Sequence, residues 1–280
     1  MQLLTPQRKG PICMFMAAFF WSFGGLLIRF MPWHAMSIVG TRALFAALLF
    51  AIWRRSLKFR FTRGNVIAAI CLALTTNLFV FANQLTTAAA AVLLQFTVPI
   101  WVIILELIFF GKKPRISSLV AVSVTILGMI IFFADHLGTG NMLGNILAII
   151  SGLTFAGVFV CNTRAEVDTE QSVLMGFLIN AIIGLPFIIT GATADPVAWG
   201  AAVLLGVVQV GLAYVFFTKG IKLTSALLAC LIVAIEPVLN PIWVALVFGE
   251  IPGPLSLAGG AVIILTIVTY NIWVEVRPVP

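Results

Sequence analysis

Long apolar segments alternate with short polar ones along the whole chain of 280 residues. Each apolar segment has about the 20 residues that a helix needs to cross the hydrocarbon core of a bilayer. A strand of a membrane barrel would need only about ten residues of alternating polarity. The pattern therefore predicts an all-α membrane protein with ten transmembrane helices. The predicted spans are residues 11–30, 34–53, 65–84, 88–110, 116–134, 141–162, 171–190, 197–218, 224–248 and 255–273.

The composition agrees with a protein whose solvent is the lipid bilayer. Hydrophobic residues make up 62% of the chain and charged residues 9%, and the mean hydropathy is +1.17. A soluble domain has about 25% charged residues, so the composition excludes a soluble enzyme and a disordered chain. Four cysteines, Cys13, Cys71, Cys161 and Cys230, all fall inside apolar segments. They have no metal-ligand spacing, and we interpret them as small apolar residues rather than a disulfide framework.

The basic residues predict the orientation of the chain in the membrane. The net charge is +7, yet the positive charges lie in short stretches between apolar segments, which argues against a nucleic-acid partner. If the amino terminus is cytoplasmic, all of the 16 basic residues except Arg29 and Arg42 fall at or near cytoplasmic segments. The positive-inside rule therefore predicts a multi-pass protein of the inner or plasma membrane with both termini in the cytoplasm. Arg8 and Lys9 before an apolar segment are also typical of a signal peptide, but the segment is long and lacks a cleavage site, so we expect a retained first span.

The two halves of the sequence resemble each other. Matching residues lie 138 positions apart: Leu85-Thr86-Thr87-Ala88 with Leu223-Thr224-Ser225-Ala226, Pro99 with Pro237, Phe110 with Phe248, Gly111 with Gly249 and Pro114 with Pro252. This predicts two repeats, residues 1–137 and 138–280, of five spans each. Because five is odd, the second repeat must enter the membrane the opposite way round. Inverted repeats are typical of secondary transporters, which bind substrate near the midplane between the halves and work by alternating access.

Two stretches also carry a family resemblance. The second span contains Gly40-Thr41-Arg42-Ala43-Leu44-Phe45-Ala46-Ala47, and residues 214–250 hold a proline-centred span that ends in Phe248-Gly249-Glu250. With ten spans in two halves, the chain resembles the EamA-type branch of the drug/metabolite transporter superfamily, and within it most the YddG-type exporters of aromatic amino acids. The first half departs from this pattern with Gly111-Lys112 in place of Gly249-Glu250. The resemblance implies a metabolite carrier, although related folds carry different solutes.

Glu236 is the most informative polar residue, because charged groups inside a membrane are costly and often functional. It lies near the middle of the ninth span, directly before Pro237, which removes a backbone hydrogen bond and frees a carbonyl. Such a carboxyl group can receive an ammonium group or a proton; alternatively, it is a neutral group bonded to a neighbouring helix. Asn240 and Trp243 share its helical face. We expect this face to point toward a cavity.

Other polar and aromatic residues near mid-span are candidate cavity-lining groups. Those predicted here are Gln95 and Trp101 beside Pro99, Asn77 in the third span, Gln209 and Tyr214 in the eighth, and Trp21 in the first. Helix packing is an equally good explanation for several of them. Arg42 is the one basic residue deep in a span, and a buried Arg needs a partner. It either binds a substrate carboxylate or pairs structurally with Glu236 or with helix-end carbonyls, and the structural role is the more common one.

No motif points to a cofactor, a metal ion or catalysis. The chain has no cluster with metal-ligand spacing, no phosphate-binding glycine loop and no nucleophile elbow. We therefore expect a transporter that exports small apolar or aromatic amino acids and related metabolites. Alternatives are a multidrug, nucleoside or nucleotide-sugar carrier of the same superfamily, a channel, or an enzyme acting on lipid-linked substrates. The partners expected are a small-molecule substrate and the lipid bilayer; a monomer fits the pattern, which does not predict oligomeric state.

Overall fold

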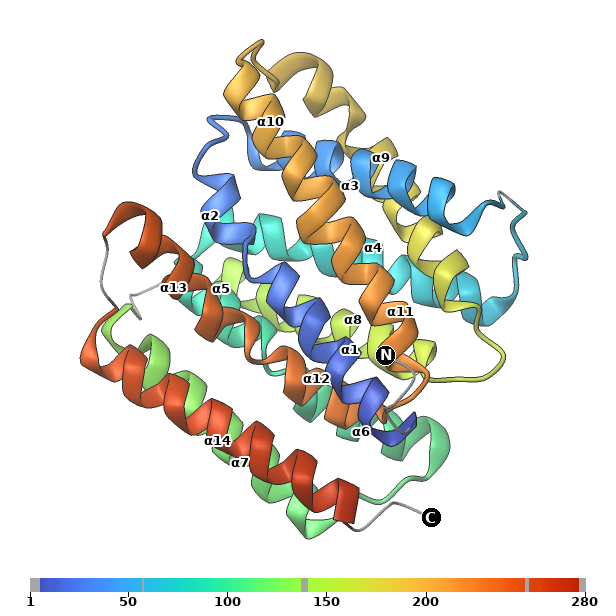
Figure 1. Ribbon diagram of the computed structural model, residues 1–280, viewed down its shortest axis with the longest axis vertical. Coiled ribbons are helices and arrows are strands. Elements are labelled where there is room, and N and C mark those ends of the chain that lie inside the picture. The colour runs from blue at the N-terminus through green and yellow to red at the C-terminus, as the bar shows by residue number, and fades with distance from the viewer. Residues whose placement is uncertain (1–5, 57, 137–140, 250–251, 277–280) are drawn as a thin grey trace.

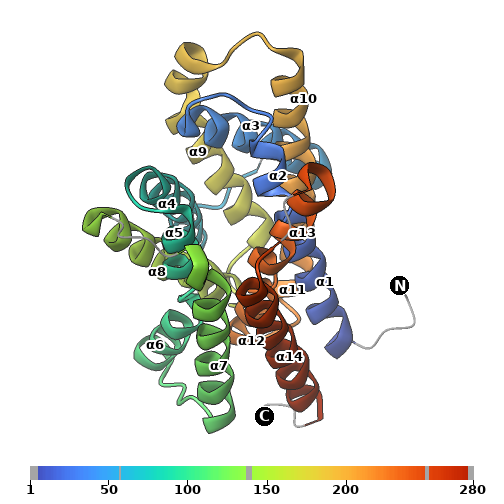
Figure 2. The same ribbon diagram turned by 90° about the vertical axis from the view of Figure 1, so that its left-hand side faces the viewer.

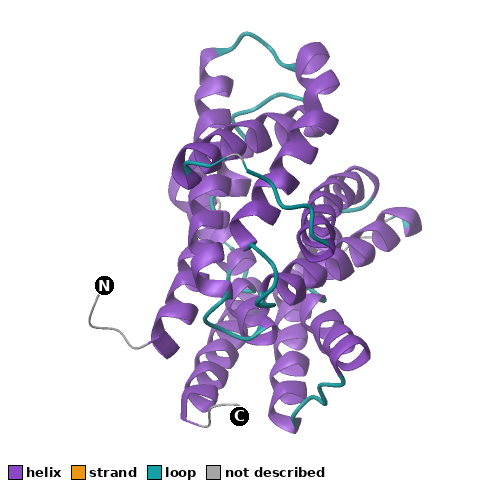
Figure 3. Cartoon of the chain, turned by 90° about the vertical axis from the view of Figure 1, so that its right-hand side faces the viewer, coloured by secondary structure: helices purple, strands orange, loops and turns teal. Residues whose placement is uncertain are grey.

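The computed structural model describes residues 6–56, 58–136, 141–249 and 252–276. Two residues used above lie outside this range: Glu250 of the family motif and Arg277, one of the basic residues that predict the topology. The described chain contains helices and loops, and no strand occurs in it (Figure 3). The predicted all-α class is therefore confirmed.

Ten segments of the described chain are long and apolar enough to cross a membrane, which confirms the predicted number. We number them as spans 1 to 10. They are formed by α1 (Pro6–Trp21) with α2 (Gly24–Ile28); α3 (Ala35–Arg54); α4 (Arg63–Leu85); α5 (Ala88–Gln95) with α6 (Val98–Phe110); α7 (Ile116–Phe133), which a short 3₁₀ turn η1 (Ala134–His136) follows; α8 (Met142–Asn162); α9 (Thr169–Gly191); α10 (Pro196–Leu204), η2 (Leu205–Leu212) and α11 (Ala213–Ile221); α12 (Ala226–Val233) with α13 (Glu236–Phe248); and α14 (Pro254–Val276).

Spans 4 and 9 are interrupted at their matching prolines, as expected. Pro99 stands at the second position of α6 and Pro237 at the second position of α13. Neither has an N–H for the carbonyl four residues earlier, so the helix cannot continue regularly through it. In span 9 the amides of Ala234 and Ile235 bond back only as far as Cys230 and Ile232, and the new helix starts at Glu236.

Spans 1 and 8 are irregular in a way that the hydrophobic pattern does not predict. Span 1 turns at Ser22 and Phe23, between the end of α1 and the start of α2 at Gly24. Span 8 contains the π-helical segment η2, which begins just before Gly206 and includes Gln209. Such wide turns often accompany functional sites. Their matching spans 6 and 3 are single regular helices, α8 and α4.

The ten spans pack so that the first helix of each half lies against the other half. α8 of the second half packs on α4, α5 and α6, whereas α1 of the first half packs on η2, α11 and α12. Figure 2 shows α4, α5 and α8 on the left of the molecule and α1, α11 and α13 on the right. Spans 2 and 7 pack on each other, as do spans 5 and 10. Each prominent contact between two spans is therefore matched by a contact between the corresponding spans of the opposite halves.

Glycines make two of these matched contacts possible. A Cβ at Gly10 would lie 2.5 Å from the Leu223 carbonyl oxygen, and a Cβ at Gly144 would lie 2.8 Å from the Thr86 amide nitrogen. Span 1 thus approaches the backbone of the loop between spans 8 and 9, and span 6 approaches the backbone of the loop between spans 3 and 4. Only glycine permits such an approach.

The ends of the spans fall on two faces. Both termini of the described chain lie at the right of Figure 1, whereas α2, α5 and the end of α13 lie at the left. We call the first of these the terminal face and the second the opposite face. An even number of spans requires both termini to lie on the same face. The terminal face carries the basic loops from which the cytoplasmic assignment was predicted.

Candidate functional site

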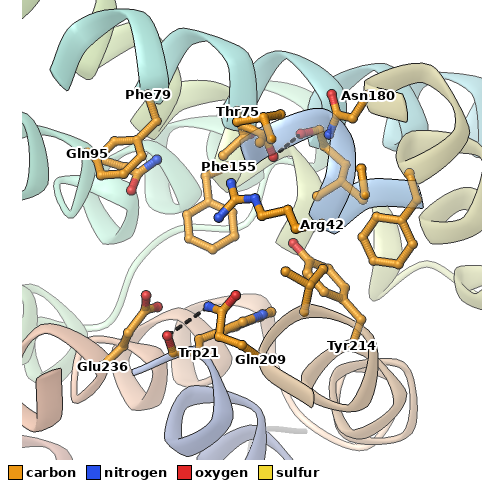
Figure 4. Close-up of a pocket in the computed structure, with 16 residues that line it drawn as sticks. Trp21, Arg42, Thr75, Phe79, Gln95, Phe155, Asn180, Gln209, Tyr214 and Glu236 are labelled. Carbon is orange, nitrogen blue, oxygen red and sulfur yellow. Dashed lines mark hydrogen bonds between the residues drawn. The ribbon is translucent and has the colours of Figure 1, made fainter. Parts of the chain in front are cut away.

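A central cavity of about 130 Å³ lies where the irregular spans meet the regular ones. Residues of eight spans line it, among them Trp21 of α1, Arg42 of α3, Phe155 of α8 and Glu236 of α13 (Figure 4). It sits at mid-span in these helices, so it is deep within the apolar layer. Its two charged residues come from opposite walls.

Arg42 and Glu236 face the same space without touching. Among the described residues Arg42 makes no hydrogen bond and no ion pair within 4.0 Å, so neither structural pairing considered for it from the sequence occurs. In Figure 4 its guanidinium points into the cavity, the Tyr214 hydroxyl lies beside it, and the Glu236 carboxyl group enters from across the gap. A basic and an acidic side chain held apart in a low-dielectric space leave room for a group that contacts both.

Aromatic rings form much of the remaining wall. Trp21 contacts Tyr214 edge-on at 4.9 Å between ring centroids, and Tyr214 contacts Phe177 at 5.2 Å. Phe155 continues this cluster at 6.4 Å from Trp21, and Phe79 lies on the other side of the cavity. These rings offer apolar faces beside the two charges. The cavity is therefore suited to a solute with polar ends and an apolar body.

Amide side chains are fixed around the cavity by hydrogen bonds. Gln209 Nε2 donates to the carbonyl oxygen of Trp21 at 2.8 Å, where α1 ends and a backbone carbonyl is free. Gln95 Nε2 donates to Ser151 Oγ at 2.7 Å, and Asn77 Nδ2 donates to Asn180 Oδ1 at 2.7 Å. The buried Gln209 Oε1 has no partner among the described residues. It remains available as an acceptor close to the charged pair.

The central cavity continues to the opposite face through two further spaces. A neck of about 310 Å³ shares Trp21, Arg42 and Glu236 with the central cavity. An outer vestibule of about 570 Å³ adjoins the neck and includes Arg29 and Thr87. The neck alone is within the range of about 300–1,000 Å³ typical of small-ligand pockets. Shared lining residues thus link the charged pair, space by space, with the opposite face.

The terminal face is closed by polar contacts between loops. Lys222 Nζ donates to the carbonyl oxygens of Arg164 at 2.6 Å and Val167 at 2.7 Å, and Arg54 pairs with Asp168 at 3.4 Å. Burial lowers the pKa of Lys222, although Asp168 acts against this shift. Beneath them, rings such as Phe159 and Phe217 are fully buried. The structure is thus open on one face and sealed on the other.

The structure brings most of the predicted site residues together. Trp21, Arg42, Gln95, Gln209, Tyr214 and Glu236 line the central cavity, and Asn240 lines the neck and the vestibule. Asn77 does not line the cavity, but it donates a hydrogen bond to Asn180, which does. The helix breaks at the two matching prolines are present, including the one at Pro237 that is expected to free a carbonyl near Glu236.

Two predicted tryptophans have other positions. Trp243 lines none of these three spaces: its Nε1 donates to Ser22 Oγ at 2.8 Å and its ring stacks on Phe23 at 4.7 Å. Trp101 packs against the core and its Nε1 donates to Thr97 at 3.2 Å. Both rings find a partner for their N–H within the helix packing, so neither points into the cavity. Glu106, near the end of span 4 at the terminal face, pairs with Lys112 at 2.8 Å.

Several lining residues were not predicted from the sequence. Asn180 is an amide in the middle of span 7, the same signal that selected Asn77, and it could have been found in that way. Thr75 and Thr76 bond carbonyls of their own helix and resemble ordinary helical threonines. Phe155 and Phe177 are two of 23 phenylalanines, and nothing in the pattern separates cavity rings from lipid-facing ones.

Comparison with known proteins places this geometry in a family. The model of the EamA-like transporter family matches residues 8–134 and 142–272. An uncharacterized transporter, YwfM, of Bacillus subtilis is 26% identical over 264 residues, which are 89% of each protein. An uncharacterized transporter of Archaeoglobus fulgidus is 28% identical over 195 residues, 68% of this chain and 70% of its own. The pseudopaline exporter CntI of Pseudomonas aeruginosa is 22% identical over 248 residues, 85% and 86% of the two chains.

A solved crystal structure shares the fold. It superimposes with a TM-score of 0.83 over 98% of this chain and 100% of its own, at 18% sequence identity. The relatives named above are not described as aromatic amino acid exporters, so that finer part of the resemblance stays a prediction. Since the family model matches nearly the whole chain in two segments, this protein is a multi-pass membrane transporter that belongs to the EamA-like transporter family.

Proposed function

We propose that this protein exports small amino acids with apolar or aromatic side chains from the cytoplasm by alternating access. The observation that carries the proposal is the position of Arg42 and Glu236 on opposite walls of one aromatic-lined cavity. The relative described as a pseudopaline exporter supports export as the direction.

The two charges suit the two ends of a zwitterion. A carboxylate can accept two parallel hydrogen bonds from the Arg42 guanidinium, which makes no hydrogen bond and no ion pair within 4.0 Å with the described residues. The ammonium group of the same molecule then lies toward Glu236. With both ends neutralised, the apolar side chain contacts the rings of Trp21, Tyr214 and Phe177. A solute with only one charged end leaves the other charge in the cavity without a partner, at a cost in binding free energy.

Alternating access follows from the inverted repeat that we infer from the sequence. The match of one family model to two segments supports this repeat, as does the pairing of helix contacts between the halves. With the basic loops in the cytoplasm, the passage opens to the outside and the contacts around Lys222 close the inside. Substrate is therefore released in the state described here and taken up when these contacts open.

The alternatives fit this site less well. A nucleotide-sugar carrier needs several cations for the phosphates, whereas Arg42 is the one cation among the described residues that line the central cavity. A channel needs a continuous path, and the described terminal face is closed. An enzyme needs a nucleophile with a base, or a metal site. No group of three side chains that could hold a metal ion occurs among the described residues.

Counterflow into proteoliposomes tests the proposal. Vesicles loaded with unlabelled phenylalanine are expected to accumulate radiolabelled phenylalanine with saturation, and 3-phenylpropionate and phenethylamine are expected to compete poorly. Arg42→Gln and Glu236→Gln should each lower the rate by roughly tenfold or more, the factor that corresponds to about 1.4 kcal/mol of lost binding.

Matched control variants exist at the terminal face. Glu106→Gln removes a carboxylate that pairs with surface Lys112, and Arg115→Gln removes an exposed cation; both should keep the wild-type rate. Equal competition by the acid, the amine and the amino acid would contradict the zwitterion site. Saturable transport of lipophilic cations but of no amino acid would show that the substrate class is wrong.

A further inference from the structure

We infer that Asn240, held in place over Gly25, is a size filter in the exit passage that decides how large a side chain the carrier can release. This inference rests on the proposed function, because it concerns the passage between the central cavity and the outside. It goes beyond that function in assigning selection by size to a point away from the charged pair.

Asn240 stands where the neck and the vestibule meet. These two spaces share five lining residues: Val92, Phe132, Phe133, Asn240 and Pro241. Any solute that leaves the central cavity for the vestibule must pass this ring of side chains. Asn240 is its one polar member, and it makes no hydrogen bond with any described residue. By contrast, the amides of Gln95 and Gln209 are tied to partners.

The helix that carries Asn240 is fixed against span 1. Trp243 Nε1 donates to Ser22 Oγ, and its indole stacks on Phe23 at 4.7 Å with the rings 19° apart. These contacts fix the rotation of α13 relative to α2. Asn240 therefore reaches the passage with only its side-chain torsions free.

Gly25 provides the space in which the amide rests. A Cβ at this position would lie 2.4 Å from Asn240 Oδ1 and 2.6 Å from Nδ2, closer than van der Waals contact allows. The atoms that clash are the end of a flexible side chain, so a larger residue at position 25 displaces the amide rather than the backbone. Because α2 occupies one side of Asn240, the displaced amide moves into the passage.

Phe132, another of the five shared lining residues, is packed too tightly to move away in compensation. Phe132 packs so closely on α14 that a Cβ at Gly259 would lie 2.4 Å from the Phe132 amide nitrogen. Phe132 as a whole residue is 5% exposed, and its ring contacts Phe133 edge-on at 4.9 Å between ring centroids. Close packing leaves such a side chain little freedom. The position of the Asn240 amide therefore sets the width of the passage.

The test is a transport series with amino acids of increasing side-chain size. Counterflow of alanine, leucine, phenylalanine and tryptophan is compared in the wild type, Gly25→Ala, Asn240→Ala and the double variant Gly25→Ala/Asn240→Ala. Gly25→Ala should lower tryptophan and phenylalanine transport relative to alanine by roughly tenfold, the lower end of what a pocket achieves against one extra methylene group. The double variant should recover the wild-type ratio, since the displaced amide is gone.

Gly200→Ala serves as the control, because a Cβ there meets no atom within 4 Å. A thermal melt of each purified variant separates loss of folding from loss of transport. An equal loss of all four substrates in a folded Gly25→Ala protein would overturn the filter, as would a double variant no better than the single one. If the wild type carries none of the four amino acids, the proposed function is wrong and the filter with it; if it carries all four and the variants show no size dependence, only the filter is wrong.

Discussion

The two halves of the molecule share a helix pattern but differ where the cavity lies. Both contain a span broken at a proline, with Pro99 in one half and Pro237 in the other. In each, the final turn of the broken span ends at a glycine with positive φ, Gly111 at 63° and Gly249 at 73°. These common features form the helical scaffold.

The differences between the halves supply the chemistry. Glu236 opens the second half of span 9, whereas the residue 138 positions earlier is the apolar Val98. Span 1 is broken at Ser22 and bonds Gln209, whereas span 6 is a regular helix. A helix pattern common to both halves thus provides the framework of the carrier, and the differences between the halves place ionisable side chains and free backbone groups around one cavity.

The largest contrast between the halves should appear in chemical labelling of their matching helix caps. Thr87 accepts from the Ala90 amide and Ser225 from the Leu228 amide, each at 3.2 Å. In a variant without native cysteines, Thr87→Cys should react fully with a membrane-impermeant maleimide added outside cells, because Thr87 lines the open vestibule. Ser225→Cys should react only after the membrane is permeabilised. Since both substitutions remove the same kind of cap, worth about 1 kcal/mol, their stability costs cancel in the comparison.

Labelling of both positions from the same side would contradict the inverted arrangement of the two halves. Labelling with the sides exchanged would keep the inverted arrangement and reverse the orientation predicted from the basic loops. Mass spectrometry of the intact protein gives the modified fraction in each case.

The two proline breaks should differ in their effect on transport. Pro237→Ala restores an N–H beside Glu236 and lets the helix straighten, which moves the carboxyl group away from Arg42. We expect a loss of roughly tenfold or more, which corresponds to about 1.4 kcal/mol. Pro99→Ala should cost clearly less, because nearby Gln95 stays bonded to Ser151 at 2.7 Å. Counterflow rates of the two variants, normalised to the amount of reconstituted protein, show whether Pro237→Ala loses more transport than Pro99→Ala. Equal losses would mean that the break in span 9 is no more important for transport than the break in span 4.

The smallest effect expected is on stability, at the crossing of spans 2 and 7. A Cβ at Gly184 would lie 2.3 Å from the Cα of Gly40, so Gly184→Ala forces two backbones apart. Overpacking of this kind costs about 1–3 kcal/mol, which lowers the melting temperature by roughly 2–10 °C in a protein of this size. Gly200→Ala, with open space around it, should melt at or above the wild-type temperature. An unchanged melting temperature for Gly184→Ala would mean that the two spans do not touch at their glycines.

Three features can be predicted from the sequence: the ten spans, the breaks at Pro99 and Pro237, and the two ionisable groups deep within the membrane. These are local properties. In lipid, each backbone polar group must be satisfied inside its own segment, so a long apolar segment has to be a helix. A proline removes one backbone hydrogen bond from that helix and marks a place where it can break. The cost of a charge in hydrocarbon likewise identifies Glu236 and Arg42 without knowledge of their neighbours.

Which side chains face the cavity depends instead on how the helices pack. Trp243 follows Glu236 on the same helical face, yet it is turned toward Ser22, and Trp101 bonds Thr97 instead of lining the cavity. Span 1 breaks at Ser22 without a proline. The rotation of a helix and the partner that satisfies a broken turn depend on contacts between residues far apart in the chain. Because most of these helices are apolar on nearly every face, the hydrophobic periodicity of the sequence does not predict those contacts.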